Sequence, residues 1–107
     1  MKIFLKRKMI MNELIILPPA AKYIKKIKNK SLKKEFQNAI DDILRDPYTG
    51  TLKTGDLAGV YCYNIYYDKV SYELAYSIVE KSNKVIVILL AGTRENFYEQ
   101  LKRYLNT

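Results

Sequence analysis

Three runs of strand-forming residues follow one another closely in the second half of the chain, and no other feature limits the fold as strongly. They are VYCYNIYY at residues 60–67, YELAYSIVE at 72–80 and VIVILLA at 85–91, all rich in β-branched and aromatic residues. The short connections DKVS and KSNK allow only antiparallel hairpins. The third run is apolar on both faces, so we expect it to be the most buried strand.

Helical patterns precede these strands. The apolar run at residues 13–17 predicts a further strand, and the prolines after it suit the first turn of a helix. Residues 20–28 repeat an apolar residue every three or four positions among lysines, which predicts an amphipathic helix with a cationic outer face. Ser31 is expected to cap a second helix that ends before Pro47.

The remaining segments complete the pattern. Residues 48–59 contain three of the four glycines and few large apolar residues, so they are expected to form a loop. Thr93 is expected to cap a last helix at the C-terminus. The predicted order is β-α-α-β-β-β-α, an α+β fold in which a small antiparallel sheet carries an N-terminal helical hairpin and a C-terminal helix.

Chain length and residue content limit the number of domains, the location of the protein and the kinds of site it can contain. A chain of 107 residues is expected to form one domain, here residues 11–107, with 1–10 as an N-terminal extension because Met9 and Met11 are alternative starts. No apolar run is long enough for a membrane helix, and lysines interrupt the first residues where a signal peptide would be apolar, so we expect a cytoplasmic protein. With no histidine and a single Cys62, neither a metal site nor a cofactor is expected.

The charge is concentrated in one part of the chain. Residues 1–45 hold 12 Lys or Arg and 4 Asp or Glu, a net charge of +8, whereas residues 46–107 hold 7 of each. A one-sided basic surface favours a polyanionic partner, either nucleic acid or an acidic protein. The alternative is that the lysines only keep a small protein soluble.

Three stretches resemble the RelE/ParE superfamily of bacterial type II toxins: GDLAGVYCYNIYY, YELAYSI and VIVILLAGTRENFYEQLKRYL. The resemblance covers roughly residues 11–107 and implies the fold given above. The superfamily contains ribosome-associated mRNA endonucleases and gyrase poisons. In the nucleases, the position that Arg94 matches carries His or Arg with an aromatic residue shortly after, so the resemblance implies roles for Arg94 and Tyr98.

Cleavage of RNA through its own 2′-hydroxyl sets clear chemical requirements. It needs a base for that proton, an acid for the leaving oxygen and positive charge near the phosphorus. Arg94 suits the last task because its planar guanidinium donates two hydrogen bonds to phosphate. Tyr98 is expected to orient the substrate or donate a proton, because a phenol with an ordinary pKa is a poor base.

The central strands depart from the nuclease pattern. Relatives use His, or several Lys and Arg, on these strands, whereas residues 60–67 and 72–80 contain none of the three. Glu73 stands where a phosphate ligand is expected. It is a candidate general base, although a solvated strand residue or a partner for Arg94 or a lysine is the favoured interpretation.

Lysines supply the remaining candidates. Lys53, in the loop GTLKTGDLAG, is a weaker candidate for a phosphate contact. A diffuse surface for ribosomal RNA is expected from Lys22, Lys25, Lys26, Lys33 and Lys34.

These observations lead to one function with two alternatives. The resemblance implies a toxin that cuts mRNA on the ribosome without a metal and that a cognate antitoxin neutralises in a toxin–antitoxin hetero-oligomer. A gyrase inhibitor without chemistry of its own is the first alternative, and a degenerate module that only binds antitoxin is the second.

Overall fold

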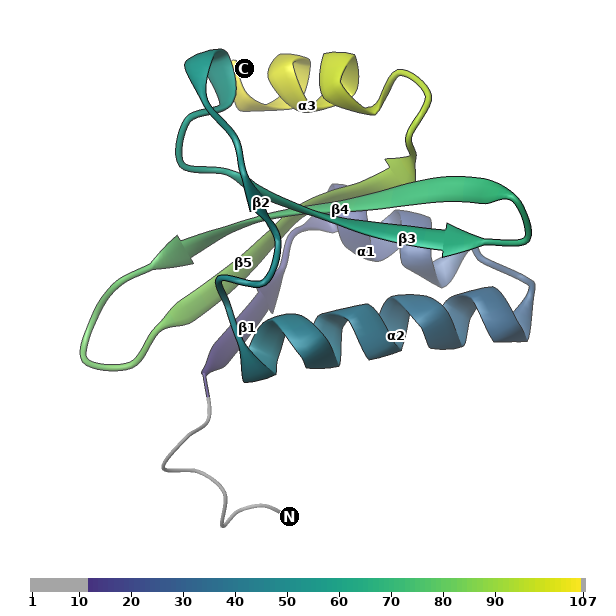
Figure 1. The fold of residues 1–107 in the computed structure, drawn as a ribbon, viewed down its shortest axis with the longest axis horizontal. Helices are drawn as coiled ribbons and strands as arrows, with labels where there is room; N and C mark the ends of the chain where they lie inside the picture. The colour runs from purple at the N-terminus through teal and green to yellow at the C-terminus, as the bar shows by residue number, and fades with distance from the viewer. Residues whose placement is uncertain (1–11, 107) are drawn as a thin grey trace, which may run out of the picture.

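The computed structural model describes residues 12–106, so the extension expected at residues 1–10 lies outside the described part of the chain. Within that part, two helices cover one face of a five-stranded sheet and a third helix packs on the other face (Figure 1). The α+β class is therefore confirmed, and the predicted helices and strands occur in the predicted order.

The helical hairpin consists of α1, Pro18–Lys25, and α2, Lys30–Arg45. Two prolines stand in the first turn of α1, as the sequence indicated. The cap of α2 is Asn29, whose side-chain oxygen accepts a hydrogen bond from the Leu32 N–H at 3.0 Å. The prediction of Ser31 as the cap is therefore wrong; Asn29 occupies the extended position just before the helix, where a capping side chain can reach the free N–H groups.

The sheet has the strand order β1-β5-β4-β3-β2. Its strands are β1 Glu13–Ile16, β2 Thr51–Leu52, β3 Tyr61–Tyr67, β4 Val70–Val79 and β5 Val85–Thr93. The three long strands form the expected antiparallel hairpins. The short β2 was not predicted, and it pairs with β3 inside the segment that was expected to be a loop.

One edge departs from the antiparallel sheet that was expected, because β1 pairs with β5 in parallel. The helical hairpin returns the chain to β2 in the direction opposite to β1, and the three strand reversals that follow bring β5 back parallel to it. The direction of the first strand depends on this path, which no local pattern encodes. The sheet is consequently mixed.

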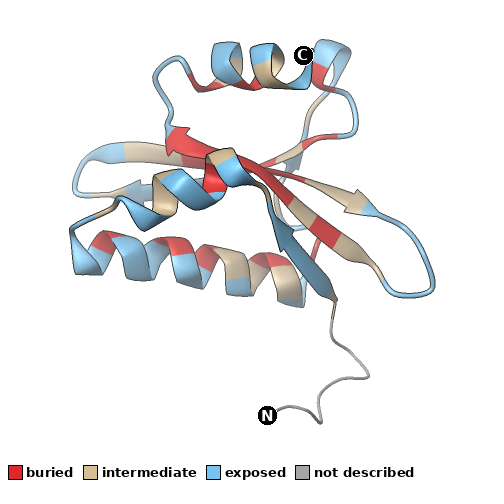
Figure 2. Ribbon diagram, turned by 180° about the vertical axis from the view of Figure 1, so that it is seen from behind, coloured by how far each residue is buried: buried red, intermediate tan, exposed pale blue. Residues whose placement is uncertain are grey.

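Two apolar clusters lie on opposite faces of the sheet. The larger joins α1 and α2 to β3, β4 and β5 and includes the fully buried Phe36, Leu74 and Tyr76. The smaller lies under α3, Phe97–Leu105, and includes Phe97 and Leu101. Figure 2 shows buried residues along the centre of the sheet and on the inner sides of the helices, while β1 is exposed along its length. The face beneath α3 therefore has a smaller apolar core and leaves room for polar groups.

Candidate functional site

Polar side chains gather on the α3 face of the sheet. Glu73, on β4, is only 3% exposed and is the buried charged residue in the part of the chain that the structure describes. Its cross-strand neighbour on β3 is Asn64, whose Nδ2 donates a hydrogen bond to the Glu73 Oε2 at 3.1 Å. The interpretation of Glu73 as a solvated strand residue is therefore wrong, and none of the ion pairs among residues 12–106 includes it. Alternation along β4 correctly placed Glu73 on the face of the smaller residues, but α3 covers that face.

Lys53 and Tyr98 form the second part of the site. Lys53 follows β2, and its Nζ lies 5.0 Å from the centroid of the Tyr98 ring, a cation–π contact between a loop and α3. The Tyr98 ring also packs edge-on against Phe97, with ring centroids 5.6 Å apart. The half-buried Tyr98 is therefore held in position from two sides.

The electrostatics join these groups into one cluster. Burial raises the pKa of Tyr98, the negative charge of Glu73 raises this pKa further, and Lys53 lowers it. Burial also raises the pKa of the Cys62 thiol to about 11, with Lys53 opposing and Glu73 adding to the shift. Tyr98 and Cys62 are therefore protonated at neutral pH, beside one carboxylate and one ammonium. We call these four residues, Lys53, Cys62, Glu73 and Tyr98, the sheet-face cluster.

An open cleft of about 290 Å³ borders this cluster. It is lined by Lys53, Thr54, Asp56, Leu57, Tyr98 and Lys102. Lys102 Nζ lies 3.9 Å from the Asp56 Oδ2, which holds a second cation beside the cleft. No sequence pattern marked Lys102 as a site residue, because a cation in the last turn of a helix is expected there from the helix dipole alone.

Arg94 occupies the turn between β5 and α3. Its N–H donates to the Ser71 carbonyl at 2.9 Å, and its own carbonyl accepts from the Phe97 N–H at 3.1 Å. α3 begins only at Phe97, after Asn96 in the left-handed conformation at φ 62°, so Thr93 is not the helix cap that was predicted. Arg94 is fixed through its backbone, outside the helix.

The Arg94 side chain is exposed. It forms no ion pair with Glu95 or Glu99 among residues 12–106, and no hydrogen bond or ring contact joins it to Tyr98 there. The structure thus brings Lys53, Glu73 and Tyr98 together and leaves Arg94 at the rim of the same end of α3. An ion pair with Glu95 or Glu99 therefore does not explain why an arginine stands at position 94.

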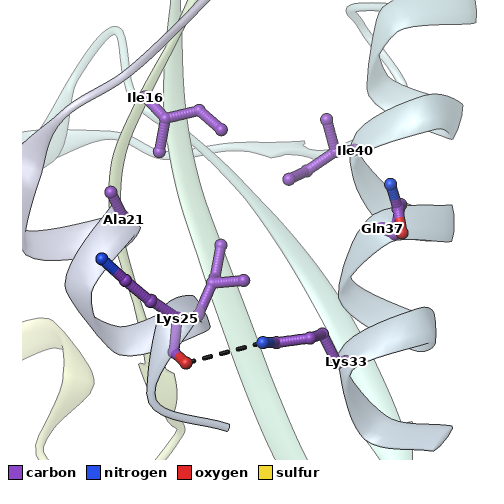
Figure 3. Close-up of a pocket in the computed structure, with 7 residues that line it drawn as sticks. Ile16, Ala21, Lys25, Lys33, Gln37 and Ile40 are labelled. Atoms are coloured by element: carbon purple, nitrogen blue, oxygen red, sulfur yellow. Dashed lines mark hydrogen bonds between the residues drawn. The ribbon is translucent and has the colours of Figure 1, made fainter. Parts of the chain in front are cut away.

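The lysines expected to contact RNA lie on the helical hairpin, in the layer opposite the sheet-face cluster. All five are exposed: Lys22, Lys25, Lys26, Lys33 and Lys34. Lys25 and Lys33 flank an apolar groove of about 360 Å³ between α1, α2 and β1, whose walls include Ile16, Ile24 and Ile40 (Figure 3). In this groove the Lys33 ammonium donates to the Lys25 carbonyl at 3.5 Å.

No group of three or more His, Cys, Asp or Glu among residues 12–106 could hold a metal ion. None of the helices described is long and apolar enough to cross a membrane.

Comparison with known proteins identifies related sequences and folds. The sequence model of the ParE-like toxins of type II bacterial toxin-antitoxin systems matches residues 14–102. No curated protein matches the chain in sequence.

Solved structures share the fold at low sequence identity. A mutant of the E. coli toxin RelE in the free state superposes with a TM-score of 0.65 at 18% identity, covering 87% of this chain and 97% of that one. The RelBE2 toxin-antitoxin complex of Mycobacterium tuberculosis gives 0.63 at 21% identity, covering 78% and 99%. The intact E. coli RelBE complex gives 0.60 at 17% identity, covering 76% and 94%.

Proposed function

The chain belongs to the ParE-like toxins of type II bacterial toxin-antitoxin systems, and on this premise we propose that it cuts mRNA on the ribosome and is neutralised by a cognate antitoxin. The observation that carries the proposal is the sheet-face cluster. It combines a carboxylate, an ammonium and a protonated phenol beside an open cleft, which are the groups that cleavage through a 2′-hydroxyl requires.

Each group has a distinct task in this reaction. Glu73 accepts the proton of the 2′-hydroxyl, whose oxygen then attacks the adjacent phosphorus. Lys53 and Arg94 balance the charge that builds up on the phosphate oxygens. Tyr98 donates a proton to the departing 5′-oxygen or orients the phosphate, because its raised pKa keeps it protonated at neutral pH. The products are a 2′,3′-cyclic phosphate and a free 5′-hydroxyl.

The burial of Glu73 adds a condition. A carboxylate that is 3% exposed touches a hydroxyl only when a neighbouring side chain moves on binding. One of its oxygens already accepts from Asn64, so the other oxygen is the one assigned to the substrate. A Gln in place of Glu73 preserves size and the Asn64 contact but removes the base.

Gyrase inhibition is the second candidate, and one observation favours it. Neither β3 nor β4 carries a Lys or Arg, so the central strands offer no cation to a phosphate. A toxin that binds gyrase and performs no chemistry does not need one. A degenerate module that only binds antitoxin does not need a cation on these strands either.

Induction of the chain in bacteria without antitoxin, with mRNA ends mapped afterwards, separates these functions. We expect growth arrest with new cuts in translated mRNA, both lost in the Arg94→Ala/Tyr98→Ala variant. The matched control, Arg45→Ala/Tyr48→Ala, removes the same residue types outside the cluster, at and just after the C-terminal end of α2, and should retain the cuts. Growth arrest without cuts, together with inhibited supercoiling by purified gyrase, would show that the chain inhibits gyrase and is not a nuclease. Expression without any effect on growth would favour the degenerate module that only binds antitoxin.

The antitoxin is proposed to cover the groove of Figure 3 and the adjoining edge of β1. Two solved relatives are toxin-antitoxin complexes. In this chain Leu14, Ile15 and Ile16 are 37%, 48% and 37% exposed on an edge strand, an arrangement that favours an added partner segment. Lys25 and Lys33 beside the groove favour an acidic segment. Ile16→Lys should weaken antitoxin binding while the free toxin still arrests growth.

A further inference from the structure

A second groove lies at the end of the helical hairpin, on the face opposite the sheet-face cluster. Its volume is about 380 Å³, and it opens where the connection between α1 and α2 meets the end of the sheet. Figure 1 shows this connection at the same end as the turn between β3 and β4. The lining residues are Tyr23, Lys26, Ile27, Lys28, Asn29, Leu32, Tyr72 and Thr93.

Two tyrosines form an aromatic platform in this groove. Tyr23 and Tyr72 are both half-buried, and each packs edge-on against the fully buried Phe36, with ring centroids 6.1 and 5.7 Å apart. The core beneath therefore fixes both rings before any ligand arrives. An unpaired base can stack on rings held in this way. Such stacking does not depend on which base is bound, because every base has a π-face.

The rim of the groove is cationic. Lys26 and Lys28 are exposed, and neither forms an ion pair with any residue in the range 12–106. No carboxylate is among the residues that line the groove. An aromatic platform beside two unpaired ammonium groups offers one surface for a base and another for a phosphate.

The groove adjoins the proposed catalytic residues around the end of the sheet. Thr93 lines it, and the next residue is Arg94. On β4, Tyr72 faces the groove while the adjacent Glu73 faces the sheet-face cluster, because successive strand residues point to opposite faces. Arg94 therefore stands between the two surfaces, where a strand bound at one could continue to the other.

We propose that this groove is a subsite for one unpaired nucleotide of the RNA strand that the toxin binds. Its base stacks on Tyr23 and Tyr72, and its phosphate contacts Lys26 and Lys28. The inference rests on the proposed function in that it takes RNA as the substrate. It differs from a diffuse basic surface because two particular lysines, Lys26 and Lys28, contact the RNA at one defined position.

Binding of a fluorescent, fully 2′-O-methylated oligonucleotide to the purified toxin tests the subsite without cleavage. In Lys26→Gln/Lys28→Gln the dependence of log K on log salt should flatten by about 0.7, the contribution of one neutralised phosphate on a single strand, because both lysines contact the same phosphate. Lys81→Gln/Lys84→Gln, which removes the same charge from the turn between β4 and β5, should flatten it far less. Tyr23→Leu should weaken binding about tenfold, within the range for one lost stack.

The outcomes separate this inference from the proposed function. Equal effects of the two lysine pairs, or no binding by the unmodified toxin, would overturn the subsite even if the toxin cuts mRNA. Weaker binding confined to Lys26→Gln/Lys28→Gln would support the subsite even if no cuts are found. Should Tyr23→Leu fail to fold, the exposed lysine variants still decide the question. Crosslinking on mRNA-loaded ribosomes from a photoreactive residue at position 28 then identifies mRNA or ribosomal RNA as the source of the nucleotide.

Discussion

The ammonium group of Lys53 lies over the ring of Tyr98, with 5.0 Å between Nζ and the ring centroid. The two residues come from a loop after the second strand and from the last helix, so only the folded chain brings them together. The contact holds a cation next to a protonated phenol at the mouth of a cleft. This relationship leads to the first of four predictions.

Lys53→Met should reduce cleavage of ribosome-bound mRNA about a hundredfold, as loss of one group that stabilises transition-state charge does elsewhere. The free energy of unfolding should fall by only about 0.5–1 kcal/mol, the value of an exposed cation–π contact. Cleavage kinetics and urea unfolding measure the two effects. Lys53→Arg, which keeps the charge, should restore most of the activity; equal activity of Lys53→Met and the unmodified toxin would contradict a phosphate role.

Glu73→Gln should lower the cleavage rate by about 10²–10⁴-fold, the usual contribution of a general base. Stability should change little, because the Gln carbonyl can still accept the hydrogen bond from Asn64. Single-turnover cleavage and thermal unfolding provide the readouts. An unchanged rate would remove Glu73 from the mechanism and leave it a structural partner of Asn64.

Tyr76→Phe should destabilise the protein by about 1–3 kcal/mol, the cost of leaving a buried partner without its hydrogen bond. The Tyr76 hydroxyl accepts from the Gly50 N–H at 3.0 Å and donates to the Pro47 carbonyl at 2.8 Å. Urea unfolding measures the loss. Tyr66→Phe is the control, because Tyr66 is 68% exposed, and it should be almost neutral. If Tyr76→Phe changed the free energy of unfolding as little as Tyr66→Phe does, the buried hydroxyl of Tyr76 would contribute nothing to stability.

Cys62 should react slowly with a thiol reagent in the folded protein at pH 8. Burial raises its pKa from the ordinary 9.0 to about 11, so the thiolate is scarce and covered. The neutral thiol is favoured in the folded state, so its contribution to stability is complete below pH 9 and is lost as the pH rises through about 11. Because the chain has one cysteine, a colorimetric thiol assay with and without urea reads this site alone. Equally rapid reaction in both conditions would contradict the burial of Cys62.

The repeating patterns of the sequence predicted most elements of the fold. The strand runs and the amphipathic spacing of the helices follow from side-chain alternation and helical periodicity, which operate over a few residues. The errors fell where two local signals competed or where no local signal existed. Asn29 and Ser31 are both good capping residues within one turn, and β2 is too short to show an alternation.

The candidate site was predicted in part. Arg94 and Tyr98 became candidates through a family resemblance, and Glu73 because it stands where that resemblance implies a phosphate ligand. Their surroundings were not predicted, because the burial of Glu73 depends on where α3 packs. Lys53 was ranked low, since nothing near it in the sequence indicated the contact with Tyr98.

By itself the sequence determined the elements, the sides of each strand and helix that are apolar, and the concentration of positive charge in residues 1–45. These properties are local, because each depends on the order of neighbouring side chains. Tertiary structure alone decided that β1 runs parallel to β5, that Glu73 is buried beside Asn64, and that Lys53 meets Tyr98. Such relationships join residues far apart in the chain, and the packing of the helices on the two faces of the sheet fixes them.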